Sequence, residues 1–287
     1  MEKNINAVRG ALQMAGPGVN VSRIITLTTD FGLSDPYVGI MKGVIFSINP
    51  EASVVDISHQ IKAGSIIHAA GLIREAYHFF PEGTVHVVVV DPGVGSERRP
   101  IVVKTEGHLF VGPDNGLFSP FIAASQHTKI IHITEKRYFR PDVSPTFHGR
   151  DIFAPVAGHL SLGVDPREMG PTISDPVSIA LPKSAKKGNI LLGEVVRVDH
   201  FGNLITNIRR DEMEQFTGTR RPVISVRDIV VEGVSRTYGD VRVGEVLALV
   251  GSSGYLEIAV NLGRACDRLG LNEDEYTGVE VEVKRTR

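Results

Sequence analysis

The chain has 287 residues, enough for one large domain or two unequal ones. Apolar residues make up 42% and charged residues 22%, which is typical of a globular protein and excludes a disordered chain. The formal net charge of -2 gives no support for a nucleic-acid partner, because a protein that binds the phosphate backbone presents a basic surface. These values favour chemistry on a small molecule.

Cys266 is the only cysteine, which excludes an intramolecular disulfide framework and favours a reducing, cytoplasmic location. No apolar run approaches the roughly 18 residues that span a bilayer, so we expect no membrane partner. Residues 1–23 contain three Gly residues, one Pro and little periodicity. We expect them to form a flexible N-terminal extension.

Strand and helix patterns alternate after this extension. The sequence predicts strands over 24–29, 53–57 and 85–90 and helices over 38–48 and 66–80. Strands joined by helices at this spacing form right-handed βαβ crossovers, so the first domain, over 24–182, is predicted to be α/β with a mostly parallel sheet. Further elements are expected over 101–111 as a hairpin, 130–133 as a strand and 152–162 as a helix.

The pattern changes beyond the stretch 171–188, which contains Pro and Lys residues and few periodic signals. We place the domain boundary there. Short alternating strands and turns then predict a smaller C-terminal antiparallel β-barrel domain over 189–287. Its strands are expected over 190–198, 204–208, 223–226, 229–231, 246–250, 255–260 and 279–283.

The stretch from Val87 to Arg99 reads VVVVDPGVGSERR and places an acid directly after a strong strand signal. Four valines bounded by turn residues are typical of a strand that is buried on both faces. Ligands of open α/β sheets bind beyond the carboxyl ends of the strands, so Asp91 is expected at the edge of a site, with Arg98 one short loop later. A turn in which Asp91 caps its own backbone is an equally good interpretation of this stretch alone.

Similar polar clusters end other strands. They are Asp30 after the first strand, Asp114 with Asn115, and the run Asp199-His200-Phe201-Gly202-Asn203 in the second domain. Each could be ordinary turn chemistry. Several of them on one scaffold favour a shared site.

A metal-dependent hydrolase is an alternative, with Asp30, Asp91, His148 and Asp151 around a divalent ion. No HxH, HExxH or HxD pair supports this alternative, and Arg98 would compete with a cation for Asp91. The glycines after Asp91 are too closely spaced for a dinucleotide-binding fingerprint. We therefore expect neither a metal nor a cofactor.

Six short motifs run in order along the chain. They are TTDFG at 28–32, DPGVGSERR at 91–99, PDNGL at 113–117, TFHGRD at 146–151, DHFGNLITN at 199–207 and GSSGYLEIAVN at 251–261. Together they resemble the motifs of the S-adenosyl-L-methionine (SAM) hydroxide adenosyltransferases, which are related to the fluorinase and chlorinase. The resemblance implies an N-terminal α/β domain, a C-terminal β-barrel, and a homotrimer with sites at subunit interfaces.

The resemblance also implies the reaction: a water or hydroxide displaces L-methionine from the ribose C5′ of SAM and forms adenosine. The water-activating triad would be Asp91, Arg98 and His148. No proton has to reach the leaving group, because a sulfonium departs as a neutral thioether. Substrate-binding roles would fall on Asp30 for the ribose, Asp199 and Ser252 for the methionine, Asn203 for the adenine edge, and Phe201 and Tyr238 for the adenine faces.

Departures from the halogenating relatives favour water as the nucleophile. Those relatives resemble this chain but carry Tyr in place of Asp91, Thr in place of Val94 and Ser in place of Gly149. A charged Asp91 would repel a halide. Ser253 replaces a halogenase arginine, which leaves the methionine carboxylate with one cation fewer. The alternative from another class is a non-catalytic protein that binds adenosine or SAM.

Overall fold

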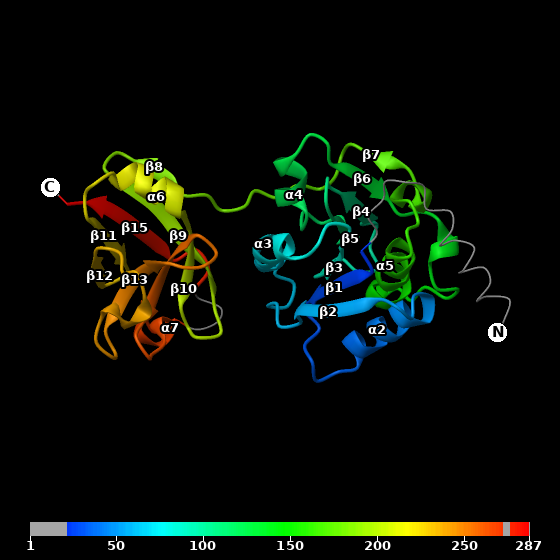
Figure 1. The fold of residues 1–287 in the computed structure, drawn as a ribbon, viewed down its shortest axis with the longest axis horizontal. Helices are drawn as coiled ribbons and strands as arrows, with labels where there is room; N and C mark the ends of the chain where they lie inside the picture. Colours follow the sequence, from blue (N-terminus) through cyan, green and yellow to red (C-terminus); the bar gives the residue numbers. More distant parts are fainter. Residues whose placement is uncertain (1–21, 272–275, 287) are drawn as a thin grey trace. The chain divides into compact units, whose positions relative to one another are not determined.

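The computed structural model describes residues 22–271 and 276–286, so residues 1–21 of the predicted extension lie outside the described residues. The chain divides between Ala180 and Leu181 into two compact units (Figure 1). The division falls within the 171–188 stretch. The limits predicted for the two domains, 24–182 and 189–287, stay predictions.

The N-terminal unit is built on one mixed sheet. Its strands are β1 (Ile24–Thr29), β2 (Ser53–Ser58), β3 (Val85–Val89), β4 (Pro100–Lys104), β5 (Leu109–Pro113), β6 (Lys129–His132) and β7 (Thr172–Ile173). They lie in the order β2-β1-β3-β5-β4-β6-β7. The pairs from β2 to β5 are parallel, and β4 and β6 pair with their neighbours in antiparallel fashion. The predicted α/β fold is confirmed, with its parallel strands in the β2-β1-β3-β5 part.

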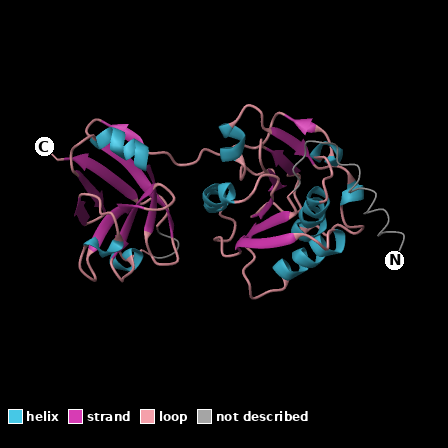
Figure 2. Ribbon diagram, viewed as in Figure 1, coloured by secondary structure: helices cyan, strands magenta, loops and turns pink. Residues whose placement is uncertain are grey.

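Helices cover this sheet on both sides (Figure 2). They are α2 (Tyr37–Ile48), α3 (Ile66–Ala76), α4 (Ser119–Ala124) and α5 (Ala154–Ser161), with short 3-10 turns η1 (Tyr77–Phe79), η2 (Lys136–Tyr138) and η4 (Pro166–Met169) and a π-helical turn η3 (Gly149–Phe153). Val38, Met41 and Ile45 recur on one face of α2 and pack into the core with α5. None of the helices in the described part of the chain has the length and apolar character needed to cross a membrane.

Strand β3 is the buried centre of the parallel part. Val87, Val88 and Val90 are fully buried, as the four-valine run predicts. The parallel register places Thr29 of β1 opposite Val89 of β3. Strands β1 and β3 therefore end at the same edge of the sheet. Asp30 and Asp91, which follow these two strands, lie at that edge.

The C-terminal unit is an antiparallel, nearly closed β-barrel, which confirms the predicted architecture. Its strands are β8 (Ala185–Lys187), β9 (Ile190–Val198), β10 (Leu204–Arg209), β11 (Pro222–Val226), β12 (Ile229–Glu232), β13 (Val246–Val250), β14 (Tyr255–Val260) and β15 (Glu280–Arg285). They lie in the order β12-β11-β15-β9-β10-β14-β13, and β8 adds to β9. The two end strands, β12 and β13, contact each other (Figure 1).

The sequence analysis did not predict the short helices of the C-terminal unit. They are α6 (Arg210–Thr217), α7 (Ala265–Arg268) and the 3-10 turn η5 (Tyr238–Asp240). Helix α6 buries little more than Met213 and Phe216 among charged residues, so its apolar pattern is weak. It is stabilised by packing on β10 and β15 rather than by a strong sequence signal.

Candidate active site

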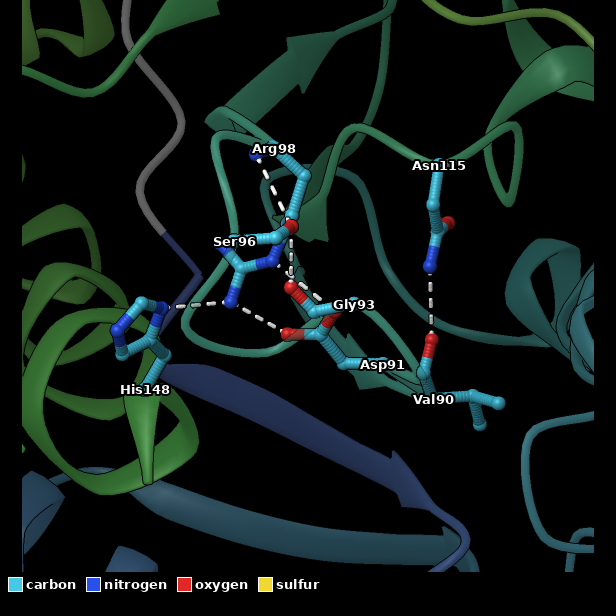
Figure 3. A network of polar contacts seen from close by, with 7 residues as sticks. All are labelled: Val90, Asp91, Gly93, Ser96, Arg98, Asn115 and His148. Atoms are coloured by element: carbon cyan, nitrogen blue, oxygen red, sulfur yellow. Dashed lines mark hydrogen bonds and ion pairs between the residues drawn. The ribbon is translucent and has the colours of Figure 1, made fainter. Parts of the chain in front are cut away.

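Asp91 and Arg98 form an ion pair directly after β3 (Figure 3). Nε of Arg98 donates to Oδ1 of Asp91 at 2.9 Å, and Nη2 donates to Oδ2. The side chains of Arg98 and Asp91 are only 8% and 5% exposed. Two parallel bonds to one carboxylate fix the plane of the guanidinium, so both charges are held in one geometry.

The loop between these two residues is folded tightly. Ser96 Oγ donates to the carbonyl of Gly93 at 2.6 Å and accepts from the backbone N–H of Arg98 at 3.3 Å (Figure 3). Gly95 has a φ of +78°, and a Cβ there would lie 2.5 Å from the carbonyl oxygen of Pro145. Only glycine fits this position, because a side chain would push away the loop that precedes His148.

His148 completes a triangle with these charges. Its Nδ1 lies 2.6 Å from Nη2 of Arg98 (Figure 3). A guanidinium has donors only, so Nδ1 accepts this bond and the ring proton is on Nε2. Burial and the nearby Arg98 charge lower the pKa of His148 below its ordinary value, which favours this neutral ring. The structure therefore brings together the three residues of the predicted triad.

Asp30 lies at the same edge of the sheet. Its Oδ2 accepts a 2.8 Å hydrogen bond from the backbone N–H of Gly64. A Cβ on Gly64 would contact Cβ of Pro92, the residue after Asp91, at 3.8 Å. The loop that binds Asp30 thus packs against the loop that carries the Asp91–Arg98 pair.

An aromatic cluster that sequence reasoning missed borders this edge. Phe31, Tyr37 and Phe147 pack edge to face, with ring centroids 5.4 to 6.0 Å apart. Phe31 follows Asp30, and Phe147 precedes His148. An aromatic residue next to each of these two candidate site residues was the sequence signal that could have predicted the cluster. Tyr37 is 45% exposed, which leaves part of the cluster open to a ligand or partner.

The cluster at Asp114 and Asn115 has a structural role. Asp114 is almost fully buried, pairs with Arg99 at 2.7 Å and accepts a 2.8 Å hydrogen bond from the N–H of Val177. Asn115 Nδ2 donates to the carbonyl of Val90 at 2.9 Å (Figure 3). These bonds tie the 175–179 segment and the end of β3 to the β5 turn.

In the C-terminal unit, Asp199 and Asn203 bind each other. Oδ1 of Asp199 accepts from the backbone N–H of Asn203 at 2.8 Å, and Oδ2 accepts from Nδ2 at 2.9 Å. Asn203 is 4% exposed. The pair closes the loop between β9 and β10 and fixes the backbone on both sides of Phe201.

A cavity of about 550 Å³ lies beside this loop. Phe201, Asn203 and Tyr238 line it together with the turn over 260–264. Phe201 is 71% exposed and Tyr238 43%, so both rings present apolar surface. The structure thus brings these three predicted residues together, whereas Ser252 is exposed on the turn between β13 and β14 and does not line the cavity.

Glu257 is a buried acid beside this cavity that sequence reasoning missed. Oη of Tyr238 donates to Oε2 of Glu257 at 3.2 Å, and Glu257 is 6% exposed. Burial, with help from the Glu257 carboxylate, raises the pKa of Tyr238 to about 12. A Cβ on Gly251 would overlap the carboxylate, so a side chain at that position would displace Glu257. The phenol of Tyr238 therefore stays protonated and its ring is held in place.

No group of three or more His, Cys, Asp or Glu side chains that could hold a metal ion occurs in the part of the chain that the structure describes. The acids of the alternative metal site have other partners. Asp91 pairs with Arg98, and Asp151 pairs with Arg150 at 2.7 Å.

Comparisons with known proteins agree with this architecture. Family models described as the SAM hydroxide adenosyltransferase N-terminal and C-terminal domains match residues 25–170 and 193–276. An (R)-S-adenosyl-L-methionine hydrolase of Salinispora tropica is 37% identical over 254 residues, which cover 86% of this chain and 94% of that protein. A fluorinase of Actinoplanes sp. is 28% identical over 274 residues, which cover 84% of this chain and 92% of that protein.

A solved structure extends the similarity to three dimensions. The crystal structure of an uncharacterized conserved protein from Thermotoga maritima matches with a TM-score of 0.85 and 38% identity, and the match covers 91% of this chain and all of that one. The order of the six motifs, the two-part fold and these matches lead to one conclusion. The chain belongs to the SAM hydroxide adenosyltransferase family.

Proposed function

We propose that this protein hydrolyses SAM to adenosine and L-methionine. The contact triangle of Asp91, Arg98 and His148 is the observation that carries the proposal. Relatives named (R)-S-adenosyl-L-methionine hydrolase support it and point to the R epimer at sulfur as the substrate. The reaction is assigned to the cytoplasm, because a chain with Cys266 as its one cysteine needs no oxidising compartment.

The reaction is a displacement at the ribose C5′. The oxygen of water forms a bond to C5′ while the C5′–S bond breaks. The electron pair of the C5′–S bond stays on sulfur. Methionine leaves as a neutral thioether, and the attacking water loses one proton. The protein therefore has to orient one water, accept its proton and stabilise the developing hydroxide.

The contacts of the triangle support the following division of these tasks. Nδ1 of His148 accepts a hydrogen bond from Arg98, so the ring has no other lone pair with which to take a proton from water. His148 therefore orients the water through Nε2–H, and Asp91 is the proton acceptor. Nη1 of Arg98 is buried and has no hydrogen-bond partner among the described residues. That donor is the one left to stabilise the hydroxide.

Substrate binding is assigned to the remaining residues. Oδ1 of Asp30 has no protein donor in the described part of the chain and can accept from the ribose hydroxyls. Phe201 and Tyr238 offer two ring faces for adenine, and Asn203 offers an amide for its edge. Asp199 and Ser252 are assigned to the methionine end.

Water rather than a halide is the proposed nucleophile. Asp91 brings a carboxylate to the site, and the buried Gly149 leaves no hydroxyl there. A Cβ on Gly149 would lie 3.2 Å from Sδ of Met41 and 3.3 Å from the Phe147 ring, so a serine would crowd its neighbours. An anion next to Asp91 would lose its water shell and meet like charge.

We further propose a homotrimer in which the N-terminal domain of one subunit and the C-terminal domain of its neighbour share each site. The cavity of the C-terminal unit is rimmed by exposed apolar side chains, among them Phe201 and Leu262, which is 85% exposed. Exposed apolar groups beside a cavity are typical of a surface that another surface covers.

Product analysis tests the reaction. Purified protein is incubated with each SAM epimer, and adenosine, methionine and 5′-halo-adenosines are separated by chromatography, with and without a chelator and with added chloride or fluoride. Adenosine from the R epimer under all these conditions is expected. No adenosine would contradict the proposal, and tightly bound adenosine without turnover would support the binding-protein alternative.

Mixing two inactive variants tests the shared site. Asp91→Ala removes a group of the N-terminal domain, and Asp199→Ala removes one of the C-terminal domain. After the two proteins are unfolded and refolded together in equal amounts, roughly one quarter of all sites combine two intact halves, so activity should return. No recovery in trimers of verified mixed composition would place each site within one subunit.

A further inference from the structure

Asp151 is a buried acid that the proposed reaction does not use. It is fully buried on the π-helical turn η3, three residues after His148. Its Oδ1 accepts from Nε of Arg150 at 2.7 Å, and its Oδ2 accepts from Nη2 of Arg150 at 2.8 Å and from the backbone N–H of Ser144 at 2.9 Å. One carboxylate thus binds both ends of the loop that presents His148.

The other side of this loop meets the loop of the ion pair. The carbonyl oxygen of Pro145 fills the space that a Cβ of Gly95 would need, at 2.5 Å. Ser144, which Asp151 binds, directly precedes Pro145. The 144–148 loop is therefore held between Asp151 on one side and the Asp91–Arg98 loop on the other.

Asp151 also acts through the turn itself. The backbone N–H groups of Arg150 and Asp151 both donate to the carbonyl of Phe147 at 3.1 Å, and the Arg150 guanidinium lies 5.2 Å from the Phe147 ring centroid. π-Helical turns are rare and occur often at functional sites. The backbone of His148 lies between these anchored neighbours.

The charge of Asp151 is maintained in the fold. Burial by itself raises the pKa of this carboxyl, but the bonds from Arg150 and from the Ser144 N–H outweigh burial, so its pKa lies below the ordinary value. Arg140 adds a second cation at 3.4 Å. An ionised, fully bonded carboxylate gives this anchor a defined geometry.

We propose that Asp151 is a positioning residue that clamps the His148 loop against the Asp91–Arg98 loop and so sets the 2.6 Å contact between His148 and Arg98. The inference rests on the proposed hydrolysis of SAM. Asp151 touches neither Asp91 nor Arg98 in the structure, and it acts on the reaction through the backbone of residues 144–148.

The test is Asp151→Asn, which keeps the shape of the side chain but loses one acceptor and the charge. We expect kcat to fall by about tenfold or more, because small displacements of a catalytic group are costly, while KM for SAM changes by less than about twofold. Asp165→Asn is the matched control. Asp165 also accepts from an arginine side chain and a backbone N–H, both of Arg167, and should keep the wild-type kcat.

The pH profile of kcat distinguishes a positioning role of Asp151 from an effect of its charge on the pKa of His148. Asp151 raises the pKa of His148, so its neutralisation should move the acid limb of kcat to lower pH. A positioning role also lowers the plateau at neutral and higher pH. A shifted limb with an unchanged plateau would overturn the proposal, since it would leave Asp151 with an electrostatic influence alone.

Gly95→Ala disturbs the contact between the 144–148 loop and the Asp91–Arg98 loop and leaves Asp151 unchanged. The added methyl group would press on Pro145, so the same fall in kcat is expected, with a thermal midpoint measured for each variant. If Asp151→Asn does not fold, Gly95→Ala decides, and a wild-type kcat there overturns the clamp. An inactive wild-type protein would instead contradict the proposed function.

Discussion

Nδ1 of His148 lies 2.6 Å from Nη2 of Arg98, although the two residues are 50 positions apart in the chain. The guanidinium can only donate, so this contact sets the tautomer of the imidazole. The same Arg98 holds both oxygens of Asp91. One cation therefore orients the proposed proton acceptor and the proposed water-orienting group together.

Replacing Arg98 by lysine is expected to lower kcat by about 10²-fold or more, because one ammonium cannot replace a planar fork that binds Asp91 and His148 at once. Adenosine formed in a single turnover, measured by rapid quench, reports this step. Arg167→Lys, which alters an exposed pair with Asp165, should keep the wild-type rate. A wild-type rate in the Arg98 variant would contradict its proposed role.

The rate should depend on pH through His148. Its pKa lies below the ordinary value of 6.5, so kcat is expected to be flat near neutral pH and to fall as the pH drops through that lowered pKa. Protonation would place a proton on Nδ1, facing the donor of Arg98. A pH profile of kcat measures the limb. The limb should be absent in His148→Gln, and its persistence there would assign it to another group.

Asp30 is expected to act in binding. Asp30→Ala should weaken adenosine binding by about 10²-fold, the order of two lost hydrogen bonds to a charged acceptor, and should change kcat less than KM. Calorimetry with adenosine and with 2′,3′-dideoxyadenosine isolates the ribose hydroxyls. The dideoxy compound should bind the wild type and the variant equally. A loss for both ligands would show that Asp30 acts through the fold of its loop.

Phe201 should matter for the nucleoside and not for folding. Because its ring is 71% exposed, Phe201→Ala is expected to leave the thermal midpoint unchanged. Loss of a stacking face should weaken adenosine binding by about tenfold. Val243→Ala is the control, since Val243 is 69% exposed and does not line the cavity. Equal effects of the two substitutions would argue against a ligand face at Phe201.

His86 should link stability to pH. It is fully buried, with Nδ1 2.8 Å from Oγ1 of Thr26 and Nε2 3.2 Å from Nδ1 of His108. Burial lowers the pKa of His86 to about 3, so below pH 6.5 the unfolded chain binds a proton that the folded chain excludes. The contribution of His86 to stability is present above pH 6.5 and is lost as the pH falls toward about 3.

Thermal or urea unfolding at about pH 7 and about pH 5 measures this linkage, which amounts to about 2 kcal/mol over that interval. His86→Gln keeps polar atoms for Thr26 and His108 but does not titrate. Its stability should therefore change less between the two pH values than that of the wild type. The same change in both proteins would assign the pH dependence to other groups.

Local sequence was sufficient for the strand that positions the site. The four valines of 87–90 determine burial on both faces, and the turn residues that follow determine where Asp91 leaves the sheet. The spacing between Asp91 and Arg98 allows a pair across one short loop. The strand and its end depend on residues within a few positions of each other, so the sequence predicts them directly. The pair of Asp91 and Arg98 was one of two equally good interpretations of the sequence, and the structure decides for it. The motifs also indicate the family.

Tertiary packing decided the rest, because contacts between residues far apart in the chain are set by how loops and elements pack. His148 contacts Arg98, and Pro145 packs against Gly95. Both contacts join loops that are separate in the sequence. The bond from Tyr238 to Glu257 likewise joins η5 to β14. No local periodicity encodes such contacts, since each depends on the distance between two surfaces after folding.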